Sequence, residues 1–223
     1  MPMTSSPQSP QYTVSVWEGI AITAGAVLLV AVGLAGLGVK ALNNAFDPRR
    51  AQATAQSIAD YQIAGGSRGV FGTNLGGGKL AVMNSLSPVA LPALPAGTSA
   101  PPQTELFLAR IPITEGATDP SSEEDITGDS SVFLSGFSFS YQDVDTFQIH
   151  SARTENRLLC GTSVPVTIQT GHLTVAAGAP SIPAVRYQGE ANFKAHTYIA
   201  IVSALGERAE DRAIEVFDSL RCR

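Results

Sequence analysis

The sequence predicts an α+β protein in which one N-terminal transmembrane helix precedes an antiparallel β-sheet domain packed with a C-terminal helix. Three observations favour this fold class: a charge-free apolar run at residues 20–39, short strand-like segments between glycine turns, and an amphipathic segment at 207–220. The chain therefore divides into a tail and three ordered parts. These are a disordered tail 1–16, a transmembrane helix 17–46, a stalk or amphipathic helix 47–62, and a soluble α+β domain 63–223 with flexible loops 86–103 and 115–131.

The apolar run IAITAGAVLLVAVGLAGLGV contains no charged residue, Asn, Gln or Pro. A helix of this length rises about 30 Å, which is the thickness of a bilayer's hydrocarbon layer. Trp17 and Lys40 flank the run as an interfacial aromatic and a snorkelling cation. The alternative, a buried core helix, needs a larger domain around it. A cleaved signal peptide fits poorly, because no Lys or Arg precedes the run. We therefore predict a single-pass protein in contact with the lipid bilayer.

Small residues recur along this predicted helix and would let a second helix approach closely. A run so rich in Gly and Ala also produces such spacing by chance. The pattern predicts contact with other membrane protein subunits, and the candidate contact residues are Ala21, Gly25, Ala31, Gly33 and Ala35.

The part of the chain that follows the apolar run shows a helix start and then a hairpin. Asp47 followed by Pro48 is typical of a helix N-terminus, and the segment behind it has a weak apolar face. This predicts a stalk, or a helix that lies against the domain. Glycines 76–78 separate two strand-like segments, which predicts a hairpin. ELFLARIPI resumes as a strand after a Pro- and Ala-rich loop.

The second half has the β-branched and aromatic content of strands. FSFSYQ, FQIHSARTENRLLCG and VPVTIQTG are predicted strands with turns at Gly161 and Gly171. AVRYQGEANF and HTYIAIVSALG resemble two antiparallel strands joined at 194–195. The final segment needs a sheet to pack on, because a short helix alone is marginal. Its apolar stripe is Ala209, Ala213, Ile214, Phe217 and Leu220.

The sequence contains no convincing motif for catalysis or cofactor binding. Gly76 to Ala81 matches a dinucleotide-binding string, but a strand follows where the phosphate needs a helix N-terminus. The acidic loop at 119–129 lacks EF-hand spacing, and no His has an evident orienting acid beside it. The net charge is −5 and dispersed, which disfavours nucleic-acid binding. We therefore predict a non-enzyme with no cofactor, no metal and no nucleic-acid partner.

Cys160 and Cys222 are the two cysteines of the chain. The first ends a predicted strand and the second follows the final helix, so a disulfide would tie that helix to the sheet. The alternative is two unrelated buried thiols. A disulfide implies an oxidising compartment and a periplasmic or lumenal domain. Lys40, Arg49 and Arg50 follow the apolar run, and the positive-inside rule instead puts the domain in the cytoplasm. We predict the periplasmic or lumenal side, with the cytoplasm as the alternative.

Residues 56–222 resemble small membrane-anchored bacterial, especially cyanobacterial, proteins of unknown function. The resemblance lies in QSIADYQIAGGSRGVFGTNLGGGKLAVMNS, ARIPI and YIAIVSALGERAEDRAIEVFDSL. The order of elements, a sheet followed by a last helix ending in DSL, is also similar to the PsbP-type domain. This resemblance implies an α-β-α sandwich that serves as a binding or assembly module without a catalytic site. No metal-related residue of that family matches a motif here.

Two functional hypotheses follow. The first is a non-enzymatic membrane accessory or assembly subunit that docks its sheet domain on a larger, photosynthetic complex. The alternative is a type IV pilin-like structural subunit, which Glu18 and the two cysteines fit. The pilin processing signal does not fit, because Thr13 stands where Gly or Ala is required.

Overall fold

The computed structural model describes residues 32–33, 36, 38–90, 100–113, 147–175 and 180–223. The chain divides into two compact units, Met1–Asn43 and Asn44–Arg223. In the first unit the described residues are helical. The second unit contains the sheet, the helices that pack on it and the candidate sites.

The transmembrane prediction is corrected by the structure. No helix within the described ranges is both long enough and apolar enough to cross a membrane. This finding overturns the predicted membrane-spanning helix at 17–46, the single-pass assignment and the location derived from it. Of the candidate helix-contact residues, Ala21, Gly25, Ala31 and Ala35 lie outside the described residues, as do most of residues 20–39. Gly33 is described, and a Cβ at this position would meet no atom within 4 Å.

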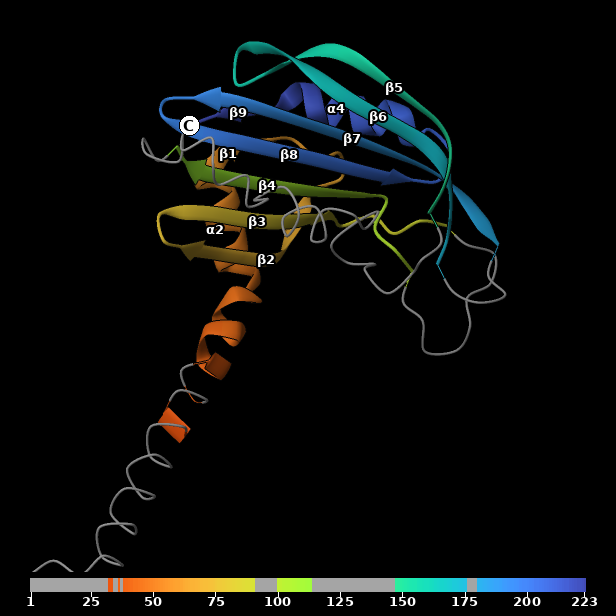
Figure 1. Ribbon diagram of the computed structural model, residues 1–223. Coiled ribbons are helices and arrows are strands. Elements are labelled where there is room, and N and C mark those ends of the chain that lie inside the picture. Colours follow the sequence, from red (N-terminus) through yellow and green to blue (C-terminus); the bar gives the residue numbers. More distant parts are fainter. Residues whose placement is uncertain (1–31, 34–35, 37, 91–99, 114–146, 176–179) are drawn as a thin grey trace, which may run out of the picture. The chain divides into compact units, whose positions relative to one another are not determined.

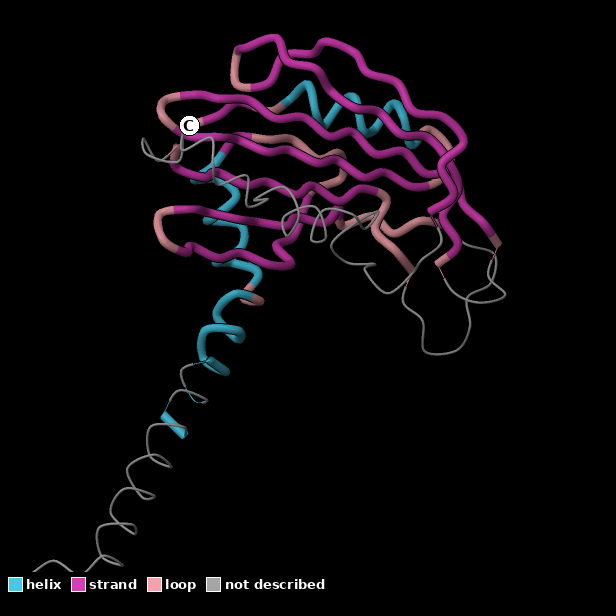
Figure 2. Tube along the Cα trace, viewed as in Figure 1, coloured by secondary structure: helices cyan, strands magenta, loops and turns pink. Residues whose placement is uncertain are grey.

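The described residues form a seven-stranded sheet in which all neighbouring strands are antiparallel (Figures 1 and 2). The fold is therefore mostly β, with short helices, and not the predicted transmembrane α+β arrangement. Across the sheet the strands are β2 (Ser67–Leu75), β3 (Gly78–Ser85), β4 (Thr104–Pro112), β8 (His196–Leu205), β7 (Ser181–Phe193), β6 (Thr162–Thr174) and β5 (Phe147–Leu159).

Three of the hairpin connections are two-residue turns with positive φ at both positions. They are Gly76–Gly77, Cys160–Gly161 and Lys194–Ala195. Positive φ at both central positions defines the type I′ turn, whose twist matches that of the flanking strands. The predicted hairpins at 76–78, Gly161 and 194–195 are confirmed. The predicted turn at Gly171 is wrong, because β6 continues through this residue to Thr174.

Two helices pack on one face of the sheet. Helix α2 (Pro48–Ile58) contacts β2 and β3, and helix α4 (Ala209–Ser219) contacts β7 and β8. Their buried side chains join one apolar core with residues from β3, β4, β6, β7 and β8, and both helices lie behind the sheet in Figure 1. Because α2 and α4 share one face, they do not form the two outer layers of the predicted α-β-α sandwich.

Helix α2 lies against the sheet, which is one of the two predicted alternatives. Its buried residues Ala51, Ala55 and Ile58 are spaced to face one side of a helix. Lys79 of β3 also donates a hydrogen bond of 2.9 Å to the Ser57 hydroxyl. The segment is thus part of the core and not a free stalk.

Replacing Asp47 by Ala is expected to lower the free energy of unfolding by about 1 kcal/mol, because the α2 N-cap is lost. The Asp47 carboxylate accepts hydrogen bonds from the backbone N–H groups of Arg49 at 2.8 Å and Arg50 at 3.2 Å. Urea denaturation of purified protein measures the change. Asp47→Asn is the control, because Asn caps helices as well as Asp does. Equal losses in both variants would contradict a capping role.

Candidate functional site

The C-terminal residues form what we call the C-terminal clasp, residues 58–60 paired with 221–223. Strand β9 (Arg221–Cys222) pairs antiparallel with β1 (Ala59–Asp60), and the Arg223 N–H donates to the Ile58 carbonyl at 3.0 Å. The Arg223 guanidinium also forms an ion pair with the Asp60 carboxylate, with a second contact at 3.2 Å. The clasp therefore joins the end of α2 to the end of the chain.

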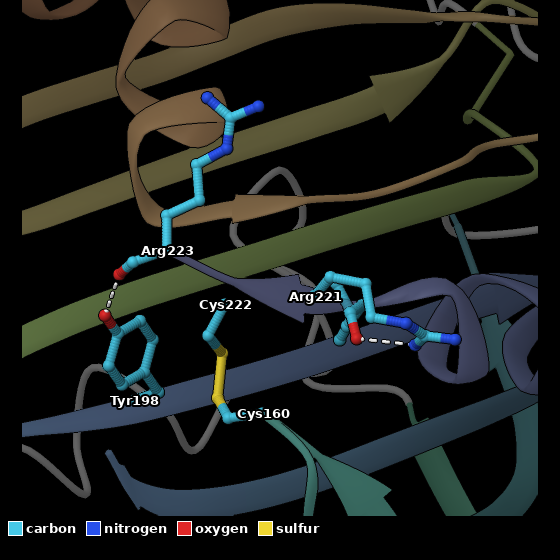
Figure 3. Close-up of a disulfide and its surroundings, with 6 residues drawn as sticks. Cys160, Tyr198, Arg221, Cys222 and Arg223 are labelled. Atoms are coloured by element: carbon cyan, nitrogen blue, oxygen red, sulfur yellow. Dashed lines mark hydrogen bonds between the residues drawn. A yellow bond between two sulfur atoms is a disulfide. The ribbon is translucent and has the colours of Figure 1, made fainter. Parts of the chain in front are cut away.

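A disulfide between Cys160 and Cys222 fixes the clasp to the sheet (Figure 3). The two Cα atoms are 4.9 Å apart and the cysteines are separated by 62 residues in sequence. Cys160 occupies the turn between β5 and β6 and is buried. Beside the disulfide, the Tyr198 hydroxyl donates a hydrogen bond to the Arg223 backbone carbonyl. The pairing proposed from the sequence is thus present: the disulfide ties the C-terminus to the β5–β6 turn, and the ladder with β1 adds a second connection.

Strand β5 carries three alternating charged residues that face α4. Arg153 contacts Glu155 at 2.8 Å and also pairs with Glu210 of α4. Arg157 contacts Glu155 at 3.0 Å and Asp218 of α4 at 3.4 Å. Hydrogen bonds from Arg153 and then Arg157 hold the pKa of the Glu155 carboxyl below its usual range. Exposed ion pairs contribute little stability, so their main effect is to orient the two arginines.

A pocket of about 540 Å³ opens where this row of charges ends. Arg221 borders it and donates hydrogen bonds of 2.8 Å to the carbonyls of Asp218 and Leu220, so it also caps the C-terminus of α4. Leu158 borders it with 63% of its surface exposed. We call this the arginine pocket, and its lining residues are Arg157, Leu158, Gly161, Asp218, Leu220 and Arg221.

Two polar atoms beside the arginine pocket are buried without a hydrogen-bond partner among the described residues. They are Arg157 Nε and the hydroxyl oxygen of Tyr187. The Arg157 guanidinium lies 5.5 Å from the centre of the Tyr187 ring, within the range of a cation–π contact. Burial raises the pKa of the Tyr187 hydroxyl. The phenol therefore stays neutral beneath the guanidinium at physiological pH.

The sheet face opposite the helices carries a buried polar row. Asn84, Glu105, Ser203 and Arg186 follow one another in register across β3, β4, β8 and β7, and all four are buried. Arg186 donates a hydrogen bond of 3.0 Å to Gln169 in the next strand, and burial lowers its pKa. Because its members are buried, this row belongs to the interior and is not an open binding surface.

A second pocket, of about 450 Å³, lies at the other end of α4. Arg212 borders this pocket and donates a hydrogen bond to the Leu205 carbonyl, so it ties the first turn of α4 to the end of β8. Burial lowers the pKa of Arg212. Val89, Ile182 and Leu205 supply apolar lining. Arg212 is the single cation of this lining and is already hydrogen-bonded to the backbone. This pocket is therefore a weaker candidate than the arginine pocket.

The other residues that the sequence singled out as candidates occupy structural positions, such as turns, or lie outside the described residues. Gly76 and Gly77 form the predicted tight turn before β3. His196 Nδ1 lies 2.7 Å from the Lys194 carbonyl at the β7–β8 turn. The acidic residues 119–129 lie outside the described residues. In the part of the chain that the structure describes, no group of three or more His, Cys, Asp or Glu residues could hold a metal ion.

The arginine pocket and the polar row were not predicted from the sequence. The alternation Arg153, Glu155, Arg157 in a strand was a usable signal, since residues two apart share one face of a sheet. The polar row had no such signal, because it depends on the register of four strands.

Comparison with known proteins gives no family. No protein-family model matches the chain, and no curated protein matches it. Among solved structures, LpqN, described as involved in cell envelope biogenesis of Mycobacterium tuberculosis, matches with 13% identity over 73% of this chain and 82% of that chain, at a TM-score of 0.38. A likeness this weak carries no argument about this chain. The comparisons do not support the predicted photosynthetic assignment, which is corrected here, and the PsbP-type resemblance stays a prediction.

Proposed function

We propose that this protein is a non-enzymatic binding module whose arginine pocket holds a carboxylate of a partner protein beside an apolar side chain. The observation that carries the proposal is the pocket itself. It places the guanidinium groups of Arg157 and Arg221 next to the exposed Leu158, on a frame fixed by the disulfide. Arginine recognises carboxylates through its planar fork and is enriched in protein interfaces.

The charges of the pocket favour an acidic group. Its lining contains two arginines and one aspartate, whereas the whole chain carries a net charge of −5. The contact between Arg157 and Asp218 is 3.4 Å, which is longer than the usual 2.7–2.9 Å of a charge-assisted hydrogen bond. A partner carboxylate can therefore replace Asp218 at Arg157 Nη1, while Arg157 Nη2 keeps its 3.0 Å contact with Glu155.

The non-enzymatic part of the proposal rests on where the reactive side chains lie. Both cysteines are in the disulfide, so neither thiol is available as a nucleophile. His150 and His172 contact each other, and His196 contacts a backbone carbonyl. Within the described ranges no histidine is positioned by a carboxylate beside a Ser, as nucleophilic catalysis requires.

The test is recovery of a bound partner from an extract of the source organism by immobilised wild-type protein and four variants. Leu158→Ser and Arg157→Gln are each expected to lower the recovery of that partner about tenfold, because one removes the apolar contact and the other the charge. Leu86→Ser is the matched control for the first, since Leu86 is 58% exposed outside the pocket. Arg208→Gln is the control for the second, since the Arg208 side chain is 79% exposed.

Circular dichroism of each variant verifies that the sheet is intact. Recovery that is the same for the pocket variants and their controls would overturn the arginine pocket as the binding site. Full recovery retained by all four variants would show nonspecific retention and would likewise overturn the site. Turnover of the partner or of another bound molecule would overturn the non-enzymatic assignment.

A further inference from the structure

Two histidine rings face each other at the start of the edge strand, far along β5 from the arginine pocket. His150 of β5 and His172 of β6 have their Nδ1 atoms 3.3 Å apart and their ring centres 4.7 Å apart. His150 is exposed and His172 is half-buried. The pair is therefore open to solvent and to small ions.

A β-bulge brings the two rings together. Ile149 pairs with Gly171 and Ser151 pairs with Thr170, so His150 is an extra residue on its strand. In a regular ladder, Gln148 would be the only residue of β5 opposite His172. Bulges of this kind re-aim a side chain next to a site. Here the extra residue adds a second imidazole beside His172.

Gly171 makes the bulge possible. A Cβ at this position would lie 1.9 Å from the Gln148 carbonyl oxygen and 2.8 Å from its carbonyl carbon, both of them backbone atoms. Any side chain at 171 would therefore push β5 away from β6. Next to it, the hydroxyl groups of Ser151 and Thr170 lie 2.7 Å apart in a hydrogen bond that fixes the adjoining pair of residues. The local backbone thus holds the two rings in one arrangement.

The separation of the two nitrogens fits a shared metal ion. Imidazole nitrogens bind Zn²⁺ at about 2.0–2.1 Å, and two such ligands at a tetrahedral angle are about 3.3–3.4 Å apart. The 3.3 Å between His150 Nδ1 and His172 Nδ1 equals this spacing. Neutral imidazole suits Zn²⁺, Cu²⁺ and Ni²⁺, whereas Mg²⁺ and Ca²⁺ prefer oxygen.

We propose that His150 and His172 form a two-histidine site for a divalent transition-metal ion of the zinc and copper class. Each ring binds through Nδ1, and solvent supplies the remaining ligands, since no third His, Cys, Asp or Glu of the described chain joins the pair. Two protein ligands on an exposed strand give an exchangeable site and not a structural one. The site is independent of the proposed partner binding at the arginine pocket.

The test is calorimetric titration of the full, tag-free chain with CuSO₄, ZnCl₂ and, as a chemical control, MgCl₂. Wild-type protein is expected to bind one Cu²⁺ or Zn²⁺ ion and no Mg²⁺. His150→Gln and His172→Gln are each expected to weaken binding at least tenfold, because loss even of a supporting partner costs about 10–100-fold. His196→Gln is the matched control, because it removes the third histidine at the β7–β8 turn.

Nuclear magnetic resonance of the histidine rings provides the second measurement. Zn²⁺ is expected to shift the ring signals of His150 and His172 and to leave those of His196 in place. Wild-type protein that binds neither Cu²⁺ nor Zn²⁺ would overturn the site. Equal weakening in His196→Gln, or full binding retained in either pair variant, would also overturn it.

Gly171→Ala separates the backbone contribution from the ligands. This variant keeps both histidines but cannot keep the bulge, so metal affinity is expected to fall about tenfold or more while circular dichroism still shows the sheet. If the variant does not fold, His150→Gln and His172→Gln carry the test alone. A folded Gly171→Ala protein with wild-type affinity would contradict the role of the bulge.

Discussion

Replacing both Cys160 and Cys222 by alanine is expected to lower the free energy of unfolding by about 4 kcal/mol. The disulfide closes a loop across a sequence separation of 62 residues, and removing it returns conformational freedom to the unfolded chain. Typical single domains have only about 5–15 kcal/mol of stability, so this loss is a large fraction of the total. Guanidinium denaturation of the variant and of oxidised wild-type protein measures the difference.

The same variant should loosen the C-terminal clasp before the rest of the sheet. Without the disulfide, the clasp is held by a two-residue ladder, by hydrogen bonds of Arg221 and Arg223, and by an ion pair between Asp60 and Arg223 that is more than half exposed. Hydrogen exchange of the backbone amides of residues 221–223 is expected to become faster, while the amides of β8 stay protected. Wild-type protein treated with a reductant is the control and should behave like the variant. A denaturation midpoint that does not change on reduction would contradict a stabilising disulfide.

Local elements of this fold could be predicted from the sequence where a short segment determines its own structure. The Gly76–Gly77 turn and the cap at Asp47 depend only on nearby residues, and both occur as predicted. The stripe of α4 was also visible, although Val216 is buried in place of the predicted Ile214, which is half-buried. Periodicity therefore places the buried face of this helix only approximately.

Longer-range features could not be predicted, because they depend on strand register. Gly171 predicts a turn by its residue type, yet it lies inside β6, where it accommodates the bulge at His150. The histidine pair follows from that bulge and has no signature in sequence spacing. The apolar run at 20–39 predicted a membrane helix from composition alone, and the described helices do not support it.

The candidate site was predicted in part. Cys160 and Cys222 could be paired because one ends a strand and the other follows the last helix. The arginine pocket required the additional knowledge that β5 lies beside α4, which brings Arg157 to Asp218. That neighbourhood comes from the strand order, in which β5 is an edge, and strand order is a property of the whole sheet.

Replacing Phe217 by alanine is expected to cost about 3–5 kcal/mol of the free energy of unfolding, the usual range for a large buried aromatic residue. Phe217 is fully buried, and its ring centre lies 6.0 Å from that of Tyr187. The ring fills space that β7 leaves open at Gly189, where a Cβ would lie 2.9 Å from the end of the ring. Removing the ring therefore leaves a cavity between α4 and the sheet that the neighbouring side chains cannot fill. Urea denaturation should show a lower midpoint with an unchanged slope, as for a loss of stability without a change in surface exposed on unfolding.

Phe46→Ala is the matched control, because Phe46 is 52% exposed and touches Phe71 at a ring-centre distance of 5.3 Å. It removes the same number of atoms, and its expected cost is about 1 kcal/mol, the worth of one aromatic pair at the surface. Phe217→Leu should fall between the two, since most of the buried apolar volume remains. If Phe217→Ala and Phe46→Ala shifted the midpoint equally, α4 would not be seated on the sheet through Phe217. Helix α4 also bears Asp218 of the arginine pocket. That result would therefore contradict the explanation that the packing of α4 on the sheet places Asp218 beside Arg157.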